Sequence, residues 1–207
     1  MRKPLLLRGA RQVGKSSAVR HFGKEFQFFA EVNFERHKTV KTFFQGDIDI
    51  RLIVQKIAIY INVPIEEGKT LLFLDEIQEC PEAIMALRFF KEDYPGLHVI
   101  AAGSLLEFTL QELPTFGVGR IHTLFMYPMT FDEFLNANNE NGLISMKKQA
   151  DSQHPLDAAF HEKLIEYFRI YLLVGGMPEA VLARGESQQN LLLIEYQRIK
   201  YLKECNC

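Results

Sequence analysis

The sequence predicts an α/β fold in which a parallel β-sheet is flanked by helices. Three observations lead to this prediction. Short apolar runs alternate with segments of helical periodicity, which is the pattern of strand–helix–strand units. The run 70–74 is almost wholly apolar, as expected for a central strand that is buried on both faces. A glycine-rich loop joins the first apolar run to the first helical segment, so a ligand is expected at the carboxyl ends of the strands.

The first half of the chain supplies most of the expected sheet and its helices. The apolar residues after the glycine-rich loop recur at helical spacing, so one face of that helix packs on the sheet. The segment 47–62 is best interpreted as a helix capped by an aspartate, although its β-branched residues leave a strand as the alternative. Pro81 suits the first turn of another helix. In order, strands are expected at 5–7, 27–34, 70–74 and 97–102, and helices at 16–26, 47–62 and 81–93.

The second half is expected to complete the sheet and then to become helical. Thr130 and Glu133 fit a capping box at a helix start, and Met129 and Phe134 fit a hydrophobic staple. Capping explains the adjacent acids Asp132 and Glu133 better than a catalytic or metal-binding pair does. The expected elements are a strand at 119–127, this helix, a polar linker at 138–154, and helices at 156–174 and 187–201 joined by Gly175-Gly176-Met177-Pro178.

Composition and charge set limits on the function. Of the 207 residues, 47% are hydrophobic and 24% are charged, as in a soluble globular protein. The net charge of -2 argues against nucleic-acid binding by a whole basic face. No apolar stretch is long enough for a membrane span, and the run after the basic N-terminus ends at Arg8, too early for a secretory signal. A cytoplasmic protein without membrane contact is expected, and its three cysteines do not form a metal-site pattern.

Residues 9–16 match G-x-x-x-x-G-K-[ST], the phosphate-binding loop or Walker A motif. The glycines allow a tight turn in which backbone N–H groups face phosphate oxygens, and the next helix adds its positive end. Lys15 reaches the β- and γ-phosphates, and Ser16 offers its hydroxyl to Mg²⁺. The flanking strand and helix disfavour the alternative, a simple turn with a solvated lysine. ATP and Mg²⁺ are therefore the expected ligands, bound by Gly9, Ala10, Arg11, Gln12, Val13, Gly14, Lys15, Ser16 and Ser17.

Asp75 and Glu76 directly follow the apolar run, in the place of a Walker B motif. A carboxylate at the end of a buried strand can hold Mg²⁺ opposite Ser16, and Asp75 is placed for that role. Glu76 points elsewhere and can polarise a water molecule for in-line attack on the γ-phosphate. The alternative interpretation is a turn after a strand that carries two solvated acids.

Ser104 and Arg120 complete the catalytic candidates, together with Lys15 and Glu76. Ser104 ends the next strand and can contact the γ-phosphate or the attacking water as a polar sensor, or it can simply belong to a turn with Gly103. Arg120 can stabilise transition-state charge in its own subunit or in a neighbour's, as an arginine finger does. Its alternative role is to pair with an acid at a strand edge.

Taken together, these motifs resemble those of prokaryotic AAA-superfamily P-loop ATPases that usually carry an uncharacterised C-terminal domain. The resemblance implies the sheet order of the additional-strand P-loop ATPases, a small C-terminal helical subdomain, and hydrolysis assigned to Glu76. It also implies a homo-oligomer, since an arginine finger supplied in trans requires a neighbour. The sequence does not name a protein or DNA partner. The stretches that carry the resemblance are 9–16, 74–78, 101–107, 118–120 with 127–135, and 171–181.

The expected domains are a P-loop ATPase core at 1–137, the linker at 138–154, and an incomplete, lid-like helical subdomain at 155–207. Proteins of this kind usually have a helical segment before the first strand that helps to enclose the base, whereas only four residues precede Leu5 here. The chain also stops about where the C-terminal domain would begin. Both ends are therefore expected to be truncated.

Three functions compete at this stage. The first is Mg²⁺-dependent ATP hydrolysis by an AAA-type core. The second is a nucleotide-gated interaction module, or a truncated remnant, that binds ATP without turnover. The third is a small-molecule kinase, which is weaker because the pair Asp75–Glu76 suits water activation and no arginine-rich lid is evident.

Overall fold

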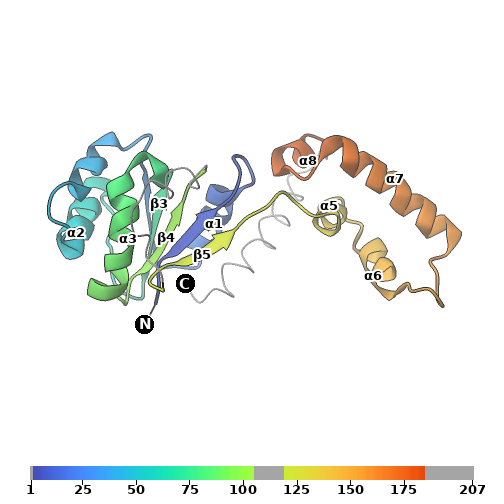
Figure 1. Ribbon diagram of the computed structural model, residues 1–207, viewed down its shortest axis with the longest axis horizontal. Coiled ribbons are helices and arrows are strands. Elements are labelled where there is room, and N and C mark those ends of the chain that lie inside the picture. Colours follow the sequence, from blue (N-terminus) through green and yellow to red (C-terminus); the bar gives the residue numbers. More distant parts are fainter. Residues whose placement is uncertain (1, 105–118, 185–207) are drawn as a thin grey trace. The chain divides into compact units, whose positions relative to one another are not determined.

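The structure, a computed structural model, describes residues 2–104 and 119–184. The chain divides into two compact units, one built on a β-sheet and one made mainly of the helices that follow Met126, with loop residues 12–14 grouped with the helices (Figure 1). Each unit is described by itself.

The sheet has five parallel strands in the order β2-β3-β4-β1-β5. β4 lies between β1 and β3, which confirms the expected additional-strand order and the α/β P-loop NTPase fold. The register aligns the strand ends, because Ala102 pairs with both Leu7 and Asp75, and Asp75 pairs with Asn33. The strands are β1 (Leu5–Arg8), β2 (Phe28–Asn33), β3 (Thr70–Asp75), β4 (His98–Ala102) and β5 (His122–Phe125).

Helices cover both faces of this sheet (Figure 1). α2 (Ile50–Ile61) and α3 (Pro81–Asp93) share one apolar core with β2, β3 and β4. α1 (Lys15–Gly23) lies on the other face, where Gly23 is so close to the Phe29 ring that an added Cβ would lie 2.4 Å from it. β3 is buried along its whole length, as its apolar sequence predicts. Two short 3₁₀ helices, η1 (Lys38–Phe44) and η2 (Ile77–Glu79), follow β2 and β3 and were not expected.

The segment 47–62 contains the helix α2, at 50–61, so the strand alternative is wrong. Its cap is Asp49, whose carboxylate accepts a hydrogen bond of 3.1 Å from the Leu52 N–H. Asn62 ends the helix in a left-handed conformation. Capping at both ends outweighs the strand preference of the β-branched residues in between.

The helical unit contains α5 (Phe131–Ala137), α6 (Asn141–Gln149), α7 (Ala158–Val174) and α8 (Pro178–Arg184). The capping box of Thr130 and Glu133 is present, and Met129 and Phe134 pack in one cluster, as predicted. α5 packs against α6 and α7 and so belongs with the helices. The helix expected at 187–201 lies outside the described residues.

One expectation for this unit is wrong, because the segment 138–154 is not a plain linker. It holds α6, and α6 buries one side chain, Leu143, against Leu135 and Leu164. A helix that buries a single apolar residue leaves almost no periodic pattern in its sequence, which explains the missed prediction.

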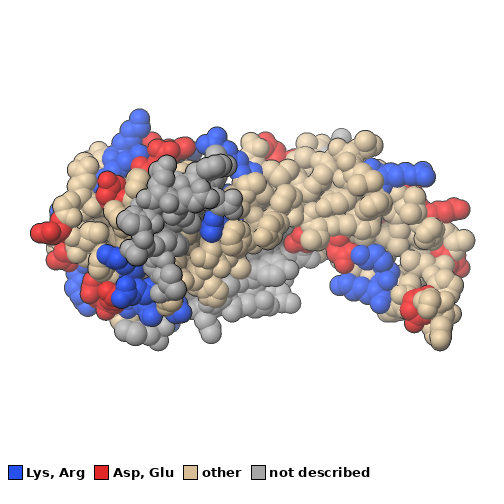
Figure 2. Space-filling view, viewed as in Figure 1, with Lys and Arg blue, Asp and Glu red and all other residues tan. Residues whose placement is uncertain are grey.

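Positive and negative side chains are interspersed over the face of the sheet unit seen in Figure 2, in keeping with the net charge of -2. Among the described helices, none is both long and apolar enough to cross a membrane.

Candidate functional site

The glycine-rich loop connects β1 to α1, as the motif predicts. Gly9 has a φ of 142°, and an added Cβ there would lie 2.1 Å from the carbonyl oxygen of Met126. Only glycine fits this position, because both the backbone conformation and the close approach exclude a side chain. Gln12 and Gly14 also have positive φ values, of 63° and 89°, so the loop turns sharply before α1 begins.

Lys15 is the first residue of α1, at the end of the loop, and is only 8% exposed. Its Nζ donates hydrogen bonds to the carbonyl oxygens of Gly9 and Ala10, at 2.9 and 2.7 Å. Burial lowers the pKa of Lys15, and the negative charges of Glu76 and Asp75 oppose that shift. A partly desolvated ammonium held inside a loop of backbone amides is suited to an anionic ligand.

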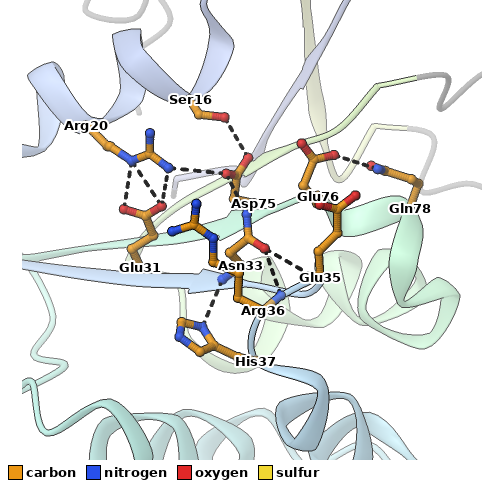
Figure 3. Close-up of polar contacts among 10 residues, drawn as sticks. All are labelled: Ser16, Arg20, Glu31, Asn33, Glu35, Arg36, His37, Asp75, Glu76 and Gln78. Carbon is orange, nitrogen blue, oxygen red and sulfur yellow. Dashed lines mark hydrogen bonds and ion pairs between the residues drawn. The ribbon is translucent and has the colours of Figure 1, made fainter. Parts of the chain in front are cut away.

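Asp75 ends β3 and is 3% exposed. The Ser16 hydroxyl donates to its Oδ1 at 2.9 Å, and the Asn33 amide donates to its Oδ2 at 3.1 Å. Arg20 approaches the same Oδ2 at 3.6 Å, and Figure 3 shows these groups converging on the carboxylate from α1 and β2. Burial nevertheless raises the pKa of Asp75, although the hydrogen bonds from Ser16 and Asn33 lower it. The site therefore stabilises the ionised form of this carboxylate less than water does.

The donor set at this point fits Mg²⁺. A hydroxyl and a carboxylate are hard oxygen ligands, and those of Ser16 and Asp75 are already in contact. The described residues contain no group of three or more His, Cys, Asp or Glu side chains that would hold a metal unaided. Magnesium is commonly held by one or two protein oxygens, substrate phosphates and water, so this pair is sufficient for the protein's share.

Glu76 has left-handed backbone angles, with φ 51° and ψ 46°, which are uncommon for a residue with a long side chain. This conformation turns Glu76 away from Asp75, and its Oε2 accepts a hydrogen bond of 2.6 Å from the Gln78 side chain (Figure 3). The two acids therefore face different surroundings, as expected if they have different roles. Such local strain is often found at functional sites.

Ser104 directly follows β4 and is 4% exposed. The Nε of Arg11, from the phosphate loop, donates to Ser104 Oγ at 3.4 Å. The structure thus brings the expected sensor residue to the loop, although 93 positions separate the two residues.

Arg120 lies elsewhere. It precedes β5, whose first residue pairs with Leu5, so Arg120 is at the amino end of the sheet whereas the phosphate loop is at the carboxyl end. Its Nε forms an ion pair of 2.8 Å with Glu92, near the end of α3. The structure shows the pairing with an acid, and within its own chain Arg120 does not join the other candidates.

Sequence reasoning missed two residues of this site, Asn33 and Arg20. Asn33 is the last residue of β2 and pairs with Asp75 in register, so a polar residue at a strand end beside the acidic strand was an available signal. Arg20 lies one helical turn after Ser16, on the same side of α1. Its guanidinium is held by Glu31, with distances of 2.7 to 3.1 Å.

A protein-family model described as an AAA domain matches residues 1–135. The chain belongs to this family. The match includes the phosphate loop, the Asp75–Glu76 pair, Ser104 and Arg120. The resemblance inferred from the motifs is thereby confirmed, and the AAA domain accounts for a nucleotide-binding ATPase core in this part of the chain.

Solved structures similar to this AAA domain include Cdc6p from Pyrobaculum aerophilum, with a TM-score of 0.45, 14% identity, and coverage of 66% of this chain and 42% of that one. The structure of Drosophila ORC bound to DNA has a TM-score of 0.47 and 16% identity, and the match covers 86% of this chain and 53% of that one. PCH-2 from C. elegans has a TM-score of 0.45 and 15% identity, and the match covers 99% of this chain and 61% of that one. This chain therefore spans less than two thirds of each of these structures. No curated protein matches it.

Proposed function

We propose that this AAA domain binds ATP with Mg²⁺ and hydrolyses the bond between the β- and γ-phosphates. The proposal depends on one observation above all, the hydrogen bond of 2.9 Å from Ser16 Oγ to Asp75 Oδ1, which joins residues 59 positions apart. P-loop ATPases hold their metal between these two kinds of group, the hydroxyl after the loop lysine and the acid at the strand end.

In this proposal, different residues bind the phosphates, hold the metal and activate water. The loop amides and Lys15 bind the phosphates, and Ser16 and Asp75 hold Mg²⁺, which neutralises phosphate charge when it is bound. Glu76 orients the attacking water and accepts its proton, after its side chain leaves Gln78.

Arg11 and Ser104 support the same step in this proposal. Because the Arg11 N–H donates to Ser104 Oγ, the serine hydroxyl acts as the acceptor in that bond. Its own proton is then free for a γ-phosphate oxygen or for the attacking water. Arg11 also brings positive charge to this position from within the chain.

The test compares nucleotide binding with phosphate release in three variants. Lys15→Ala should lose ATP binding, whereas Glu76→Gln should bind ATP and lose turnover. Glu35→Gln, which removes an exposed acid near the end of β2, serves as the matched control and should resemble the wild type. Equal phosphate release by the wild type and Glu76→Gln would remove Glu76 from the mechanism.

A second candidate function is a nucleotide-gated interaction module that binds ATP without turnover. The hydrogen bond of 2.6 Å from Gln78 to Glu76 favours it, because this bond occupies a carboxylate oxygen that a general base would use to accept a proton from water. This candidate predicts ATP-dependent protection from proteolysis without phosphate release. Turnover by the purified protein would exclude it.

We also propose that any catalytic role of Arg120 is exerted in a homo-oligomer. Arg120 is at the amino end of its own sheet, so it would have to act on the site of a second copy. Mixing Lys15→Ala with Arg120→Ala tests this, because each variant retains the part that the other lacks. Recovery of phosphate release on mixing is the expected result for a site shared between copies, and no recovery would contradict it.

A further inference from the structure

A polar pocket lies at the carboxyl end of β2, beside Asp75. Its volume is about 340 Å³, and the described residues that line it are Arg20, Glu31, Asn33, Arg36 and His37. No residue of the phosphate loop is among them. Two guanidinium groups and one carboxylate line the pocket, and a second carboxylate, that of Asp75, lies 3.6 Å from Arg20.

The Arg20 guanidinium is already paired with the Glu31 carboxylate. It makes three hydrogen bonds of 2.7 to 3.1 Å to the two oxygens of Glu31, and so the pair is nearly neutral as a unit. Arg36 is different, because its exposed guanidinium has no acceptor within the described part of the chain. In Figure 3 its side chain extends from the end of β2 toward the Arg20–Glu31 pair.

The backbone fixes which nitrogen of His37 carries the proton. The Nδ1 atom accepts a hydrogen bond of 3.2 Å from the backbone N–H of Asn33, and a backbone N–H can only donate. The proton of the neutral ring is therefore on Nε2, which makes that atom a donor. Arg36 and His37 both line the pocket, and between them they carry a planar guanidinium fork and an imidazole N–H donor.

Asn33 connects this pocket to Asp75. Its Oδ1 accepts hydrogen bonds of 3.1 Å from the backbone N–H groups of Glu35 and Arg36, which orients its amide nitrogen toward Asp75 Oδ2. One side chain therefore separates the pocket from the carboxylate assigned to the metal.

We propose that this pocket binds inorganic phosphate, held by Arg36 and His37, at a site separate from the triphosphate loop. A guanidinium fork matches two oxygens of a tetrahedral phosphate, and the His37 N–H matches a third. Resting on the proposed function, the pocket also receives the phosphate that hydrolysis releases beside Asp75 before it leaves the protein.

The direct test is a calorimetric titration with inorganic phosphate. The loop is first filled with Mg²⁺ and a nonhydrolysable ATP analogue, so that only a second site is measured; Lys15→Ala without nucleotide gives the same measurement if the analogue does not bind. The wild type should bind one phosphate. Arg36→Gln should weaken this binding roughly tenfold or more, since a charge-assisted bidentate contact is lost. Arg36→Lys should fall in between, because it keeps the charge and loses the fork.

Lys38→Gln is the matched control, since it removes an exposed cation two positions away that does not line the pocket. Equal weakening by Lys38→Gln and Arg36→Gln would show a general charge effect and overturn the site. The site is also overturned if no phosphate binds, if Arg36→Gln binds phosphate as the wild type does, or if acetate binds as tightly as phosphate. Unfolding midpoints of the variants check that each one is folded.

The role in product release has its own measurement. Added phosphate should inhibit steady-state turnover of the wild type more strongly than that of Arg36→Gln. If the wild type shows no turnover, the proposed function fails while the titration still decides the phosphate site. If turnover occurs and phosphate inhibits both proteins equally, the release role is wrong.

Discussion

Two carboxylates, the buried Asp75 in the sheet unit and the partly exposed Glu140 in the helical unit, illustrate how differently this chain treats its acids. Asp75 in the sheet unit has a raised pKa because burial outweighs its hydrogen bonds. Glu140 in the helical unit has a lowered pKa, chiefly because Lys163 donates to it, with further help from Tyr167. Glu140 accepts a hydrogen bond from the Lys163 ammonium, whereas Asp75 accepts hydrogen bonds from two neutral groups, Ser16 and Asn33, and lies 3.6 Å from Arg20. The difference teaches that desolvation dominates at the buried acid and a charged hydrogen-bond donor dominates at the more exposed one, and that a raised pKa at a strand end marks Asp75 as a candidate functional acid.

The largest expected effect distinguishes catalysis in the sheet unit from packing in the helical unit. Glu76→Gln should reduce phosphate release about 10²- to 10⁴-fold, which is the usual contribution of a general base. Glu140→Gln should leave turnover per folded molecule unchanged. Steady-state phosphate release by both variants checks this, and similar losses in the two would break the comparison.

A somewhat smaller effect is expected for binding. Lys15→Ala should weaken ATP binding roughly 100-fold, because contacts of the ammonium with two phosphates are lost. Lys163→Ala, which removes the structural cation beside Glu140, should bind ATP like the wild type. Fluorescence titration with a labelled ATP analogue measures both, and retained affinity in Lys15→Ala would contradict the assignment of the loop.

The two arginines that can supply charge to the reaction should differ as well. Arg11→Ala should lower kcat about tenfold and leave ATP affinity nearly unchanged, since Arg11 positions Ser104 and adds charge near the γ-phosphate. Arg120→Ala should have no effect on kcat at concentrations where the protein is monomeric, because the side chain pairs with Glu92 at the opposite end of the sheet. A larger loss of kcat in Arg120→Ala than in Arg11→Ala would identify Arg120 as the catalytic arginine.

The smallest effect is on stability in acid, where the two carboxylates should act in opposite directions. The pKa of Asp75 is higher in the folded protein than in the unfolded chain, so its protonated form favours folding. Its contribution to the free energy of unfolding is therefore lost as the pH rises from the ordinary aspartate pKa through the raised one. Glu140 has a lowered pKa, so its contribution is present above the ordinary glutamate pKa and is lost as the pH falls through the lowered value.

Denaturant unfolding between pH 3 and 7 measures how the free energy of unfolding changes with pH in Asp75→Asn, in Glu140→Gln and in the wild type. The loss in Glu140→Gln at neutral pH should be about 0.5–1 kcal/mol, as for a partly exposed ion pair. Slopes of the same sign for the two variants would show that the two environments do not differ in the way described.

Much of the fold was predictable because it depends on local signals. The apolar run of β3, the proline at the start of α3 and the capping box at Thr130 each identify an element without knowledge of the rest of the chain. α6 escaped prediction because it buries only Leu143.

The candidate site was predictable to the extent that its residues follow strands in sequence. Lys15, Ser16 and Asp75 stand in motifs, and the register of the parallel sheet brings their strand ends to one edge. Asn33 and Arg20 carry no motif, and their roles emerge only from the pairing of β2 with β3 and the position of α1. Arg120 shows the reverse case, because it precedes β5 and so lies at the amino end of the sheet, away from the phosphate loop.

The strand order also has a consequence for the synthesis of the protein. β1 and β3 are not hydrogen-bonded to each other, because each pairs with β4, which is formed by residues 98–102. A nascent chain that has emerged from the ribosome only as far as β3 therefore contains Lys15, Ser16 and Asp75 and still lacks the strand that brings them together. Competence to capture nucleotide should arise abruptly, when β4 inserts, rather than grow with chain length.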